Sequence, residues 1–358
     1  YWTEKFGNPS SIYSVARESR RAMDSARETV AEILNCQPRE VIFTACGSES
    51  DNTALKGVAE ANQDRGNHII TTSIEHEAIL ETCHYLEKRG FRVTYLPVDE
   101  HGTVDLVALE RALTDETIMV SVMMANNEVG TIQPLAKIAE VIKGRGIAFH
   151  TDAVQAGGSL DLDVDKLGID LMSLSGHKFY APKGVGVLYI RQGTRLMPQL
   201  LGGGQEKNRR SGTENVAYVV GLATALQLAY AELPEVQPRI QRLRDKLRDG
   251  ILQIPDVVPT GHPTERLPNN ASFCFKGAEG EQILLALDLH GIGASTGSAC
   301  TSASSEPSHV LTAMGIGASV AHGAIRMTLG KGNTDEDVDA VLGLMPDIVR
   351  KQRTLTPA

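Results

Sequence analysis

Hydrophobic residues fall into short runs rich in β-branched side chains, and these runs alternate with stretches whose apolar residues recur about every 3.6 positions. The helical spacing is clearest at 54–61, 79–89 and 135–143. The strand-like runs are Val41–Phe43, His68–Thr71, Val93–Leu96, Met119–Val122, Ala148–His150 and Leu171–Leu174. A seventh run, Val185–Ile190, follows through Pro182-Lys183-Gly184, a short connection that favours an antiparallel neighbour. This alternation predicts an α/β fold with a mostly parallel seven-stranded sheet flanked by helices.

The pattern changes around Leu233-Pro234-Glu235. A charged helix at 239–248, a strand at 271–275 and a Gly/Ser-rich stretch at 291–305 follow. We therefore predict a large domain at 1–233 and a smaller α+β domain at 234–358. The apolar stretch 216–231 is too short to span a bilayer and contains Gln227, so it is predicted to be a buried helix.

Composition narrows the class of protein. The 358 residues are 42% hydrophobic and 22% charged, which is typical of a globular chain and excludes disorder and collagen-like repeats. The net charge of −9 offers no basic surface for nucleic acid or anionic lipid. The cysteines are odd in number and contain no C-x-x-C pair, so we expect a reducing cytoplasm and no structural zinc; they are Cys36, Cys46, Cys83, Cys274 and Cys300.

Lys178 is the sharpest candidate for chemistry. It ends Ser173-Leu174-Ser175-Gly176-His177-Lys178, directly after an apolar strand, where loss of solvent lowers the pKa of a lysine and allows Schiff-base chemistry. The ordinary alternative is a surface lysine in a turn. Asp152 ends the preceding strand, and ligands of open α/β sheets bind beyond such ends, so both side chains are expected to face one crevice. A lysine and an acidic group are what pyridoxal phosphate needs, although an aspartate here can also cap the following turn.

Three other segments fit a phosphorylated cofactor and a carboxylate substrate. Residues 43–50 pass from a strand through small residues into a helix, whose free N–H groups attract phosphate; an ordinary capped helix start is the alternative. His76 can stack on a pyridine ring, move protons or simply hydrogen-bond. Arg326, within a strand-like run, can bind a carboxylate or pair with an acidic neighbour.

Cys300 differs from the other cysteines. It lies in Ser295–Ser304, which has hardly an apolar side chain, so its thiol is expected to be accessible and able to act as a nucleophile. Cys36, Cys83 and Cys274 lie on helical or strand patterns and are expected to pack in the interior. Cys46 borders the predicted phosphate turn.

Taken together, these features resemble the cysteine desulfurases, fold-type I pyridoxal phosphate enzymes of the class V aminotransferase family, and most of all the nitrogen-fixation type. The resemblance begins at Phe6-Gly7-Asn8-Pro9-Ser10-Ser11 and covers essentially the whole chain. Its specific motifs are Ser175-Gly176-His177-Lys178, Arg210-Ser211-Gly212-Thr213 and Ser298-Ala299-Cys300-Thr301-Ser302.

The resemblance implies a role for each matching residue. Lys178 would be the Schiff-base lysine, Asp152 the partner of the pyridine nitrogen and Gln155 that of the ring hydroxyl, with His76 stacked on the ring. The phosphate would be held by Gly47, Ser48, Ser175 and His177, and by Thr213 of the neighbouring subunit. Asn127 and Arg326 would bind the substrate carboxylate, and no metal is implied in the cofactor site.

The implied reaction removes sulfur from L-cysteine. Lys178 would shuttle the substrate Cα proton, and the Cys300 thiolate would attack the substrate sulfur, which leaves a persulfide on Cys300 and releases L-alanine. The sulfur would pass to an acceptor protein for iron–sulfur cluster assembly of the nitrogenase type, and Cys300 would transiently contact a cluster in that complex. We expect a cytoplasmic homodimer that binds neither nucleic acid nor membrane.

The sequence departs from the family pattern in three places. The family normally begins with a further short segment that carries a small-residue motif, whereas this sequence opens at Tyr1-Trp2-Thr3-Glu4. Tyr13 stands where histidine is usual, and Ser48 stands where threonine is common but keeps the hydroxyl. Two alternative functions follow: a selenocysteine lyase or other pyridoxal phosphate lyase for which Cys300 is dispensable, and a non-catalytic sulfur-transfer scaffold.

Overall fold

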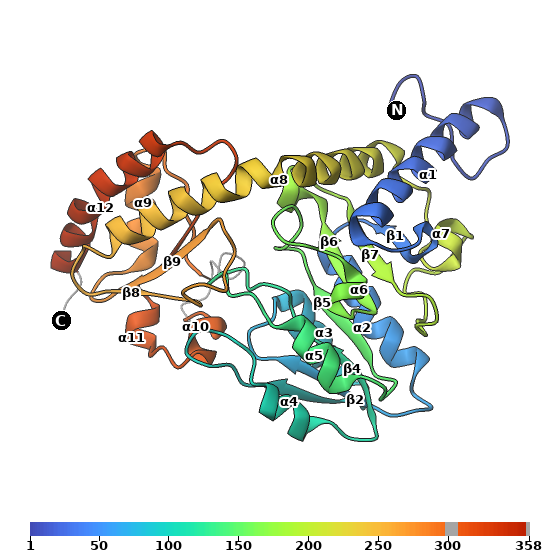
Figure 1. The fold of residues 1–358 in the computed structure, drawn as a ribbon, viewed down its shortest axis with the longest axis horizontal. Coiled ribbons are helices and arrows are strands. Elements are labelled where there is room, and N and C mark those ends of the chain that lie inside the picture. Colours follow the sequence, from blue (N-terminus) through green and yellow to red (C-terminus); the bar gives the residue numbers. More distant parts are fainter. Residues whose placement is uncertain (298–306, 356–358) are drawn as a thin grey trace. The chain divides into compact units, whose positions relative to one another are not determined.

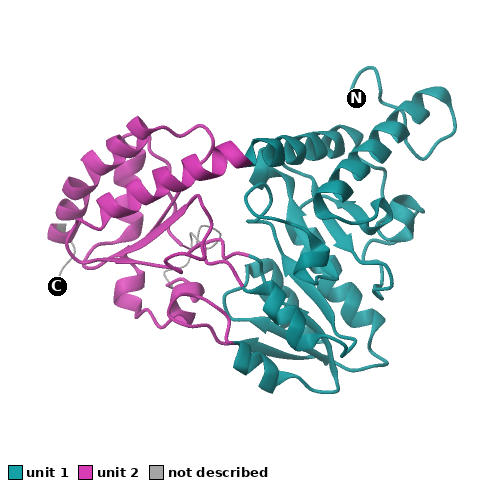
Figure 2. Cartoon of the chain, in the orientation of Figure 1, with its two compact units in different colours: residues 1–96, 106–124, 134–233 teal, residues 97–105, 125–133, 234–358 magenta. Residues whose placement is uncertain are grey.

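The computed structural model describes residues 1–297 and 307–355 (Figure 1). The chain divides into two compact units, which are coloured separately in Figure 2. Unit 1 comprises 1–96, 106–124 and 134–233, and unit 2 comprises 97–105, 125–133 and 234–358. Two short segments from the first half of the chain thus cluster with its C-terminal part. The domain assignment 1–233 and 234–358 stays a prediction about how the chain folds.

Unit 1 contains the seven-stranded sheet, in the order β1-β7-β6-β5-β4-β2-β3. Only β7 runs antiparallel to its neighbours, β6 and β1. The predicted mostly parallel sheet and its antiparallel seventh strand are therefore confirmed. The strands are β1 (Val41–Thr44), β2 (His68–Thr72), β3 (Arg92–Leu96), β4 (Thr117–Ser121), β5 (Ala148–Asp152), β6 (Leu171–Ser175) and β7 (Gly186–Ile190).

Helices surround this sheet, which explains why its strands read as nearly continuous apolar runs. Every residue of β1, β2, β4, β6 and β7 is buried, as expected for strands covered on both faces. Helix α2 (Gly47–Ala61) packs with Leu55 and Val58 against Ile69 and Leu188 of the sheet. The other helical elements of unit 1 before residue 216 are α1 (Ser14–Leu34), η1 (Pro38–Glu40), α3 (Glu77–Glu87), α4 (Leu106–Ala112), α5 (Leu135–Ile142), α6 (Val164–Leu167), η2 (Gly176–Phe179) and α7 (Gln205–Asn208).

Helix α8 (Val216–Ile251) is longer than the sequence pattern indicates. It continues through Pro234 and Pro238, so the separate helices predicted at 216–231 and 239–248 are one helix. Each proline removes one helical hydrogen bond, but Leu226 before them and Leu243 after them are fully buried, and this packing outweighs the loss. Among the described residues, α8 is the helix that is long and apolar enough to cross a membrane by length and composition alone. The prediction that this apolar segment is too short to span a bilayer is therefore wrong.

The first half of α8 is buried on one face only. Val219, Leu222 and Leu226, spaced three and four residues apart, lie in the core, whereas Leu228 is half exposed. The predicted buried helix is thus buried along the face that carries these side chains, and its opposite face is exposed.

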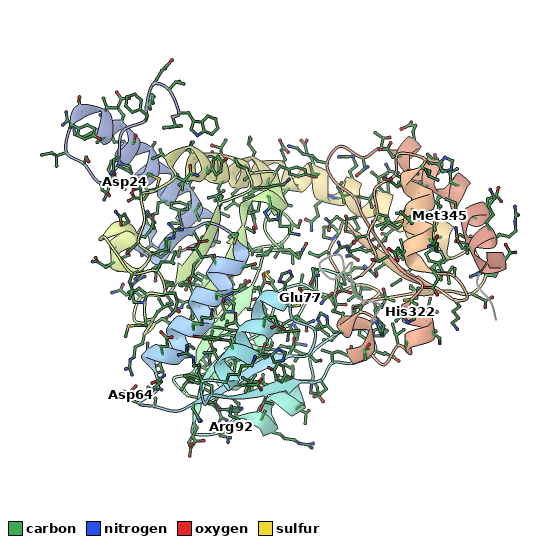
Figure 3. All side chains as sticks on the ribbon, turned by 180° about the vertical axis from the view of Figure 1, so that it is seen from behind. Asp24, Asp64, Glu77, Arg92, His322 and Met345 are labelled. Atoms are coloured by element: carbon green, nitrogen blue, oxygen red, sulfur yellow. The ribbon has the colours of Figure 1, made fainter. Side chains whose placement is uncertain are left out.

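Unit 2 is built on a small antiparallel sheet in the order β10-β9-β8. Its strands are β8 (Val257–Pro259), β9 (Asn270–Phe275) and β10 (Ala324–Thr328), and β9 confirms the strand predicted at 271–275. Its helices are the second half of α8, α9 (Gly280–Asp288), α10 (His309–Ala313), α11 (Ala318–Ala321) and α12 (Asp335–Leu355). Phe273, Ile283 and Met345 contribute to its core; Met345, on α12, is labelled in Figure 3.

Candidate active site

The carboxyl ends of the parallel strands of unit 1 gather the predicted site residues at one edge of the sheet. Gly47 follows β1, His76 follows β2, Asp152 ends β5 and Lys178 follows β6. Because these strands run in the same direction, their ends meet at the same edge, where α/β sheets bind ligands. The expected proximity of Asp152 and Lys178 is reflected in their electrostatic interaction.

Asp152 is a buried carboxyl, only 6% exposed. Its Oδ1 accepts a hydrogen bond from the Val154 N–H at 2.9 Å, so it also caps the following turn, as the alternative interpretation expected. Burial raises the pKa of Asp152, while the Val154 N–H and the charges of His76 and Lys178 oppose that shift. A cation held against this carboxyl would favour its ionised form.

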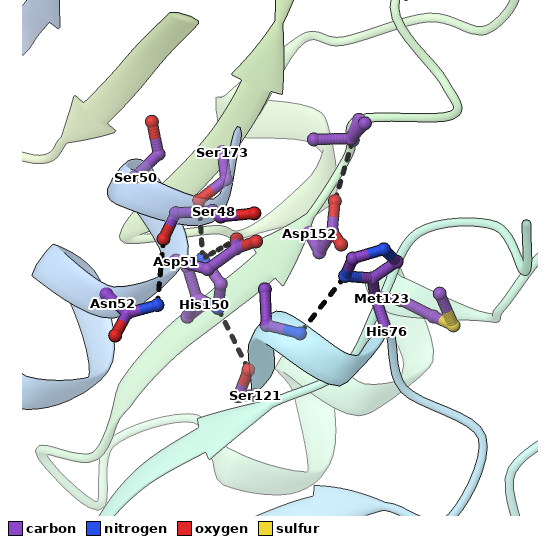
Figure 4. Close-up of polar contacts among 12 residues, drawn as sticks. Ser48, Ser50, Asp51, Asn52, His76, Ser121, Met123, His150, Asp152 and Ser173 are labelled. Carbon is purple, nitrogen blue, oxygen red and sulfur yellow. Dashed lines mark hydrogen bonds and ion pairs between the residues drawn. The ribbon is translucent and has the colours of Figure 1, made fainter. Parts of the chain in front are cut away.

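His76 is fixed in orientation by its position at the N-terminus of α3. It is the N-cap of that helix, and its Nδ1 accepts the Ala78 N–H at 3.1 Å. Its ring lies beside Asp152 in Figure 4, and the first residue of α3, Glu77, is labelled in Figure 3. His76 therefore makes a simple hydrogen bond, which was one of the alternatives that the sequence left open. Its ring also remains next to the site.

The start of α2 is suited to binding an anion. Its N-cap, Cys46, makes no side-chain capping bond. The alternative prediction of an ordinary capped helix start is therefore wrong. A Cβ added to Gly47 would lie 2.7 Å from Val154 Cγ2 and 3.3 Å from Ser175 Cβ. The helix start therefore packs directly against the ends of β5 and β6, which only a glycine permits, and the exposed Ser48 follows it.

The motif after β6 lies in the 3₁₀ turn η2. The Ser175 hydroxyl and His177 Nδ1 are 3.2 Å apart, and burial, with the nearby charge of Lys178, lowers the pKa of His177. Lys178 itself is exposed. The expectation that it loses solvent is therefore wrong for the isolated chain, because the turn carries it beyond the buried strand.

Two further predicted cofactor residues flank this edge. Gln155 is half-buried in the turn after β5. Thr213 is exposed and follows Gly212, whose φ of 120° is readily adopted only by glycine. Arg210 of the same motif donates to Glu49, at 2.8 Å between Nε and Oε1, which ties this segment to the first turn of α2.

The predicted substrate-binding residues come together within unit 2. Arg326 lies on β10, and its Nη1 donates to the Asn127 carbonyl oxygen at 2.5 Å. The backbone of Arg326 also pairs with Ser295. The guanidinium of Arg326 is thus held next to Asn127.

Cys300 lies outside the described residues. Gly297 and Ser308, which stand on either side of the undescribed segment, both contact Glu128: the Ser308 hydroxyl donates to Glu128 Oε2 at 2.5 Å, and a Cβ on Gly297 would lie 2.5 Å from the same oxygen. Sequence reasoning missed Glu128. The available signal was a carboxylate directly after Asn127, a residue already predicted to bind substrate.

The remaining cysteines behave mostly as packing residues. Cys83 and Cys274 are fully buried, as predicted, whereas Cys36 is half-buried. Burial raises the pKa of Cys36 and of Cys274 to about 12 and also raises that of Cys83, so these thiols stay protonated at neutral pH. Cys46 is half-buried at the N-cap of α2.

A buried polar layer between α2 and the sheet was also missed (Figure 4). His150 Nδ1 lies 2.9 Å from Ser121 Oγ, and its Nε2 lies 3.0 Å from Ser173 Oγ and 3.7 Å from Asp51 Oδ1. Burial lowers the pKa of His150 to about 3. Burial, and then the negative charge of Asp152, raises the pKa of Asp51. His150 is therefore neutral at pH 7, and the raised pKa of Asp51 disfavours a second negative charge beside Asp152.

Glu75 is another buried carboxyl, fully enclosed in the loop before His76. Burial is the main cause that raises its pKa from 4.5 to about 8. The folded protein therefore holds a proton on Glu75 that the unfolded chain releases between about pH 4.5 and pH 8. This difference makes unfolding release a proton within that window.

We expect the stability that wild type has relative to Glu75→Gln to fall as the pH rises from about 4.5 to about 8. One unit of pKa difference corresponds to about 1.4 kcal/mol, so the change should reach several kcal/mol. Denaturant unfolding of both proteins at several pH values measures it, with the exposed Glu81→Gln as control. A difference that stays flat across the window would show that Glu75 is ionised in the folded protein.

The donor set at this edge fits pyridoxal phosphate. An uncapped helix start and the hydroxyls of Ser48 and Ser175 suit the phosphate, the buried Asp152 suits a cationic ring nitrogen, and Lys178 offers an amine. Among the residues that the structure describes, no group of three or more histidine, cysteine, aspartate or glutamate side chains is arranged to hold a metal ion.

Comparison with known proteins identifies the family of this chain. The model of the aminotransferase class V family matches residues 1–341. The cysteine desulfurase IscS of Methanosarcina thermophila is 54% identical over 357 residues, which are 100% of this chain and 88% of that protein. The cysteine desulfurase IscS of Clostridium botulinum is 52% identical over 360 residues, covering 100% of this chain and 91% of that protein.

Solved structures show the same fold. A NifS-like protein superposes with a TM-score of 0.92 at 42% identity, covering 98% of this chain and 93% of that one. SspA, solved in complex with cysteine, has a TM-score of 0.82 at 35% identity, with 93% of each chain covered. The chain therefore belongs to the class V aminotransferase family, among its pyridoxal-phosphate-dependent cysteine desulfurases.

Proposed function

We propose that this enzyme transfers the sulfur of L-cysteine to Cys300 as a persulfide, releases L-alanine and delivers the sulfur for iron–sulfur cluster assembly of the nitrogenase type. The observation that carries the proposal is the meeting of Gly47, Asp152 and Lys178 at one sheet edge, in a chain of the cysteine desulfurase family. Delivery to nitrogenase-type cluster assembly is the more specific part of the proposal, and it rests on the sequence motifs alone.

Each site residue has a proposed part in holding the cofactor. Lys178 attaches it covalently, Asp152 binds the ring nitrogen, and Gln155 binds the ring hydroxyl. His76, whose Nδ1 is held by the Ala78 N–H, packs on the ring. The phosphate is bound by the start of α2 and by hydroxyl and imidazole groups, namely Gly47, Ser48, Ser175 and His177, with Thr213 reaching it from the neighbouring subunit.

Bound pyridoxal phosphate supplies a protonated ring that withdraws electrons from the substrate Cα. Asp152 keeps the ring nitrogen protonated, because a buried carboxylate is stabilised by a cation held against it. The amine of Lys178 would accept the substrate Cα proton and later return it. Asn127 and Arg326 bind the substrate carboxylate.

Sulfur transfer is the task of Cys300. Its thiolate attacks the sulfur of the substrate, so that a sulfur–sulfur bond forms while the substrate carbon–sulfur bond breaks. The electron pair of the broken bond stays with Cβ, which takes up a proton and becomes the methyl group of L-alanine. The persulfide then passes its outer sulfur to an acceptor protein.

The exposed apolar surface of unit 1 supports a homodimer. Leu228 on α8 is half exposed, and Ile12 and Leu201 are largely exposed, so apolar side chains are available for contact with a second copy. Thr213 is exposed on the same unit, so a second copy can supply it. We further propose a cytoplasmic enzyme whose partners are L-cysteine and a sulfur acceptor, without nucleic acid or membrane.

The test is the absorption spectrum of the purified protein before and after addition of L-cysteine, with alanine and sulfide measured in the same sample. We expect a visible cofactor band that shifts on addition, together with both products. A band without products would contradict the proposed reaction, and a colourless protein would contradict the cofactor site. Delivery of sulfur to a nitrogenase-cluster scaffold, compared with a general one, tests the finer assignment.

A further inference from the structure

Glu75 joins the ends of two neighbouring strands beneath the site. Its Oε1 accepts the hydroxyl of Thr72, the last residue of β2, at 2.7 Å and the N–H of Met123, just beyond β4, at 3.0 Å. These strands pair in parallel, and the side chain of Glu75 is 0% exposed. One carboxyl oxygen thus holds both strand ends and the loop between β2 and α3 together.

The residue that follows is His76, and its backbone has little freedom. On one side, the fully buried Ile74 and Glu75 hold the loop, and the Ser73 N–H donates to the Leu96 carbonyl at 3.0 Å. On the other side, His76 Nδ1 accepts the Ala78 N–H at the start of α3. Two anchors therefore determine where the imidazole ring lies relative to Asp152: the helix start and the carboxyl of Glu75.

Burying a carboxyl at a fully enclosed position has a large desolvation cost. An apolar side chain of similar volume would fill the space without the cost of removing a polar group from water. An apolar side chain cannot, however, accept directional hydrogen bonds from a hydroxyl and an N–H at the same time. The advantage of Glu75 is thus geometric: it fixes the loop at a defined point.

We propose that Glu75 is a positioning residue for His76, which through its hydrogen bonds to Thr72 and Met123 holds the imidazole ring in place next to Asp152. This inference rests on the proposed stacking of His76 on the cofactor ring. It assigns Glu75 no contact with cofactor or substrate. It predicts that the neutral Glu75→Gln still holds the His76 ring in place, because the amide oxygen accepts the same two hydrogen bonds.

The experiment compares Glu75→Ala, Glu75→Gln, His76→Ala and the double variant Glu75→Ala/His76→Ala as cofactor-loaded enzymes. The readouts are circular dichroism of the cofactor band and the rate of cofactor dissociation. We expect His76→Ala and Glu75→Ala each to alter the dichroism in the same way and to speed dissociation about 3- to 10-fold. The double variant should match His76→Ala within twofold, since Glu75 acts through His76.

The matched control is Glu40→Ala. Glu40 is also buried and accepts two backbone N–H groups, those of Gln37 at 2.8 Å and Gln192 at 2.6 Å, but it lies at the opposite end of β1 from Gly47. It should lower stability without changing the cofactor band. Thr72→Val removes only the hydroxyl donor to Glu75, and a weaker change in the same direction is expected from it.

Three results would overturn the inference. The first is a double variant whose dissociation rate shows the product of the two single-variant increases. The others are a Glu75→Gln protein that behaves like Glu75→Ala, and a Glu40→Ala protein with the same spectral change. Failure of the underlying proposal looks different. If His76→Ala leaves the dichroism and the dissociation rate unchanged, the proposed stacking of His76 is wrong, whatever Glu75 does.

Discussion

Replacing Lys178 by alanine should reduce the release of alanine from L-cysteine by at least about 10³-fold. The variant loses both the amine that attaches the cofactor and the base that accepts the Cα proton. Lys178→Arg keeps a positive charge near Asp152 without a nucleophilic amine, so it should be equally inactive. The rate of alanine formation and the absorption spectrum of the purified variants measure the effect.

Lys183→Ala is the matched control, because Lys183 is an exposed lysine only five residues further along. It should retain turnover and the visible band. If Lys178→Ala kept both, Lys178 would not be the attachment site and the proposed reaction would lose its proton acceptor.

Replacing Cys300 by serine should abolish persulfide formation on the enzyme and reduce sulfide release on the order of 10²-fold or more, because a hydroxyl at this position is a poor nucleophile toward sulfur. The cofactor band and its shift with L-cysteine should remain, since Cys300 acts only on the substrate sulfur. Mass spectrometry after brief exposure to L-cysteine detects the persulfide directly.

Cys46→Ser provides the control thiol, because Cys46 is half-buried at the start of α2 and is assigned no sulfur chemistry. Full cysteine turnover by Cys300→Ser would refute the persulfide mechanism. If that same variant also turned over selenocysteine at the wild-type rate, the alternative of a selenocysteine lyase would replace it.

The sheet of unit 1 was largely predictable, because its burial leaves a strong mark on the sequence. Strands covered on both faces need apolar side chains at every position, so runs such as 41–43 and 171–174 stand out and correspond to β1 and β6. The order of the strands could not be obtained in this way. Neighbours such as β1 and β7 are far apart along the chain, and their pairing depends on contacts that local patterns do not encode.

Helix α8 shows how local signals mislead. Prolines at 234 and 238 and the change from apolar to charged residues predict two helices, because proline disfavours a helix interior. Buried leucines on both sides of the prolines decide the outcome instead. Likewise, segments 97–105 and 125–133 lie early in the sequence but cluster with unit 2 through long-range contacts.

The candidate site also has features that the sequence predicts and features that only the structure shows. The sequence by itself determined the chemical groups: Asp152 and Lys178 after apolar strands, the small-residue turn at Gly47 and the thiol of Cys300. The structure decided which other groups lie near the described site residues, including Glu75, Glu128, and the Asp51–His150 layer. Reactive groups follow strand ends and are visible locally, whereas the pKa of a buried carboxyl and the partner of a hydrogen bond depend on residues that only folding brings together.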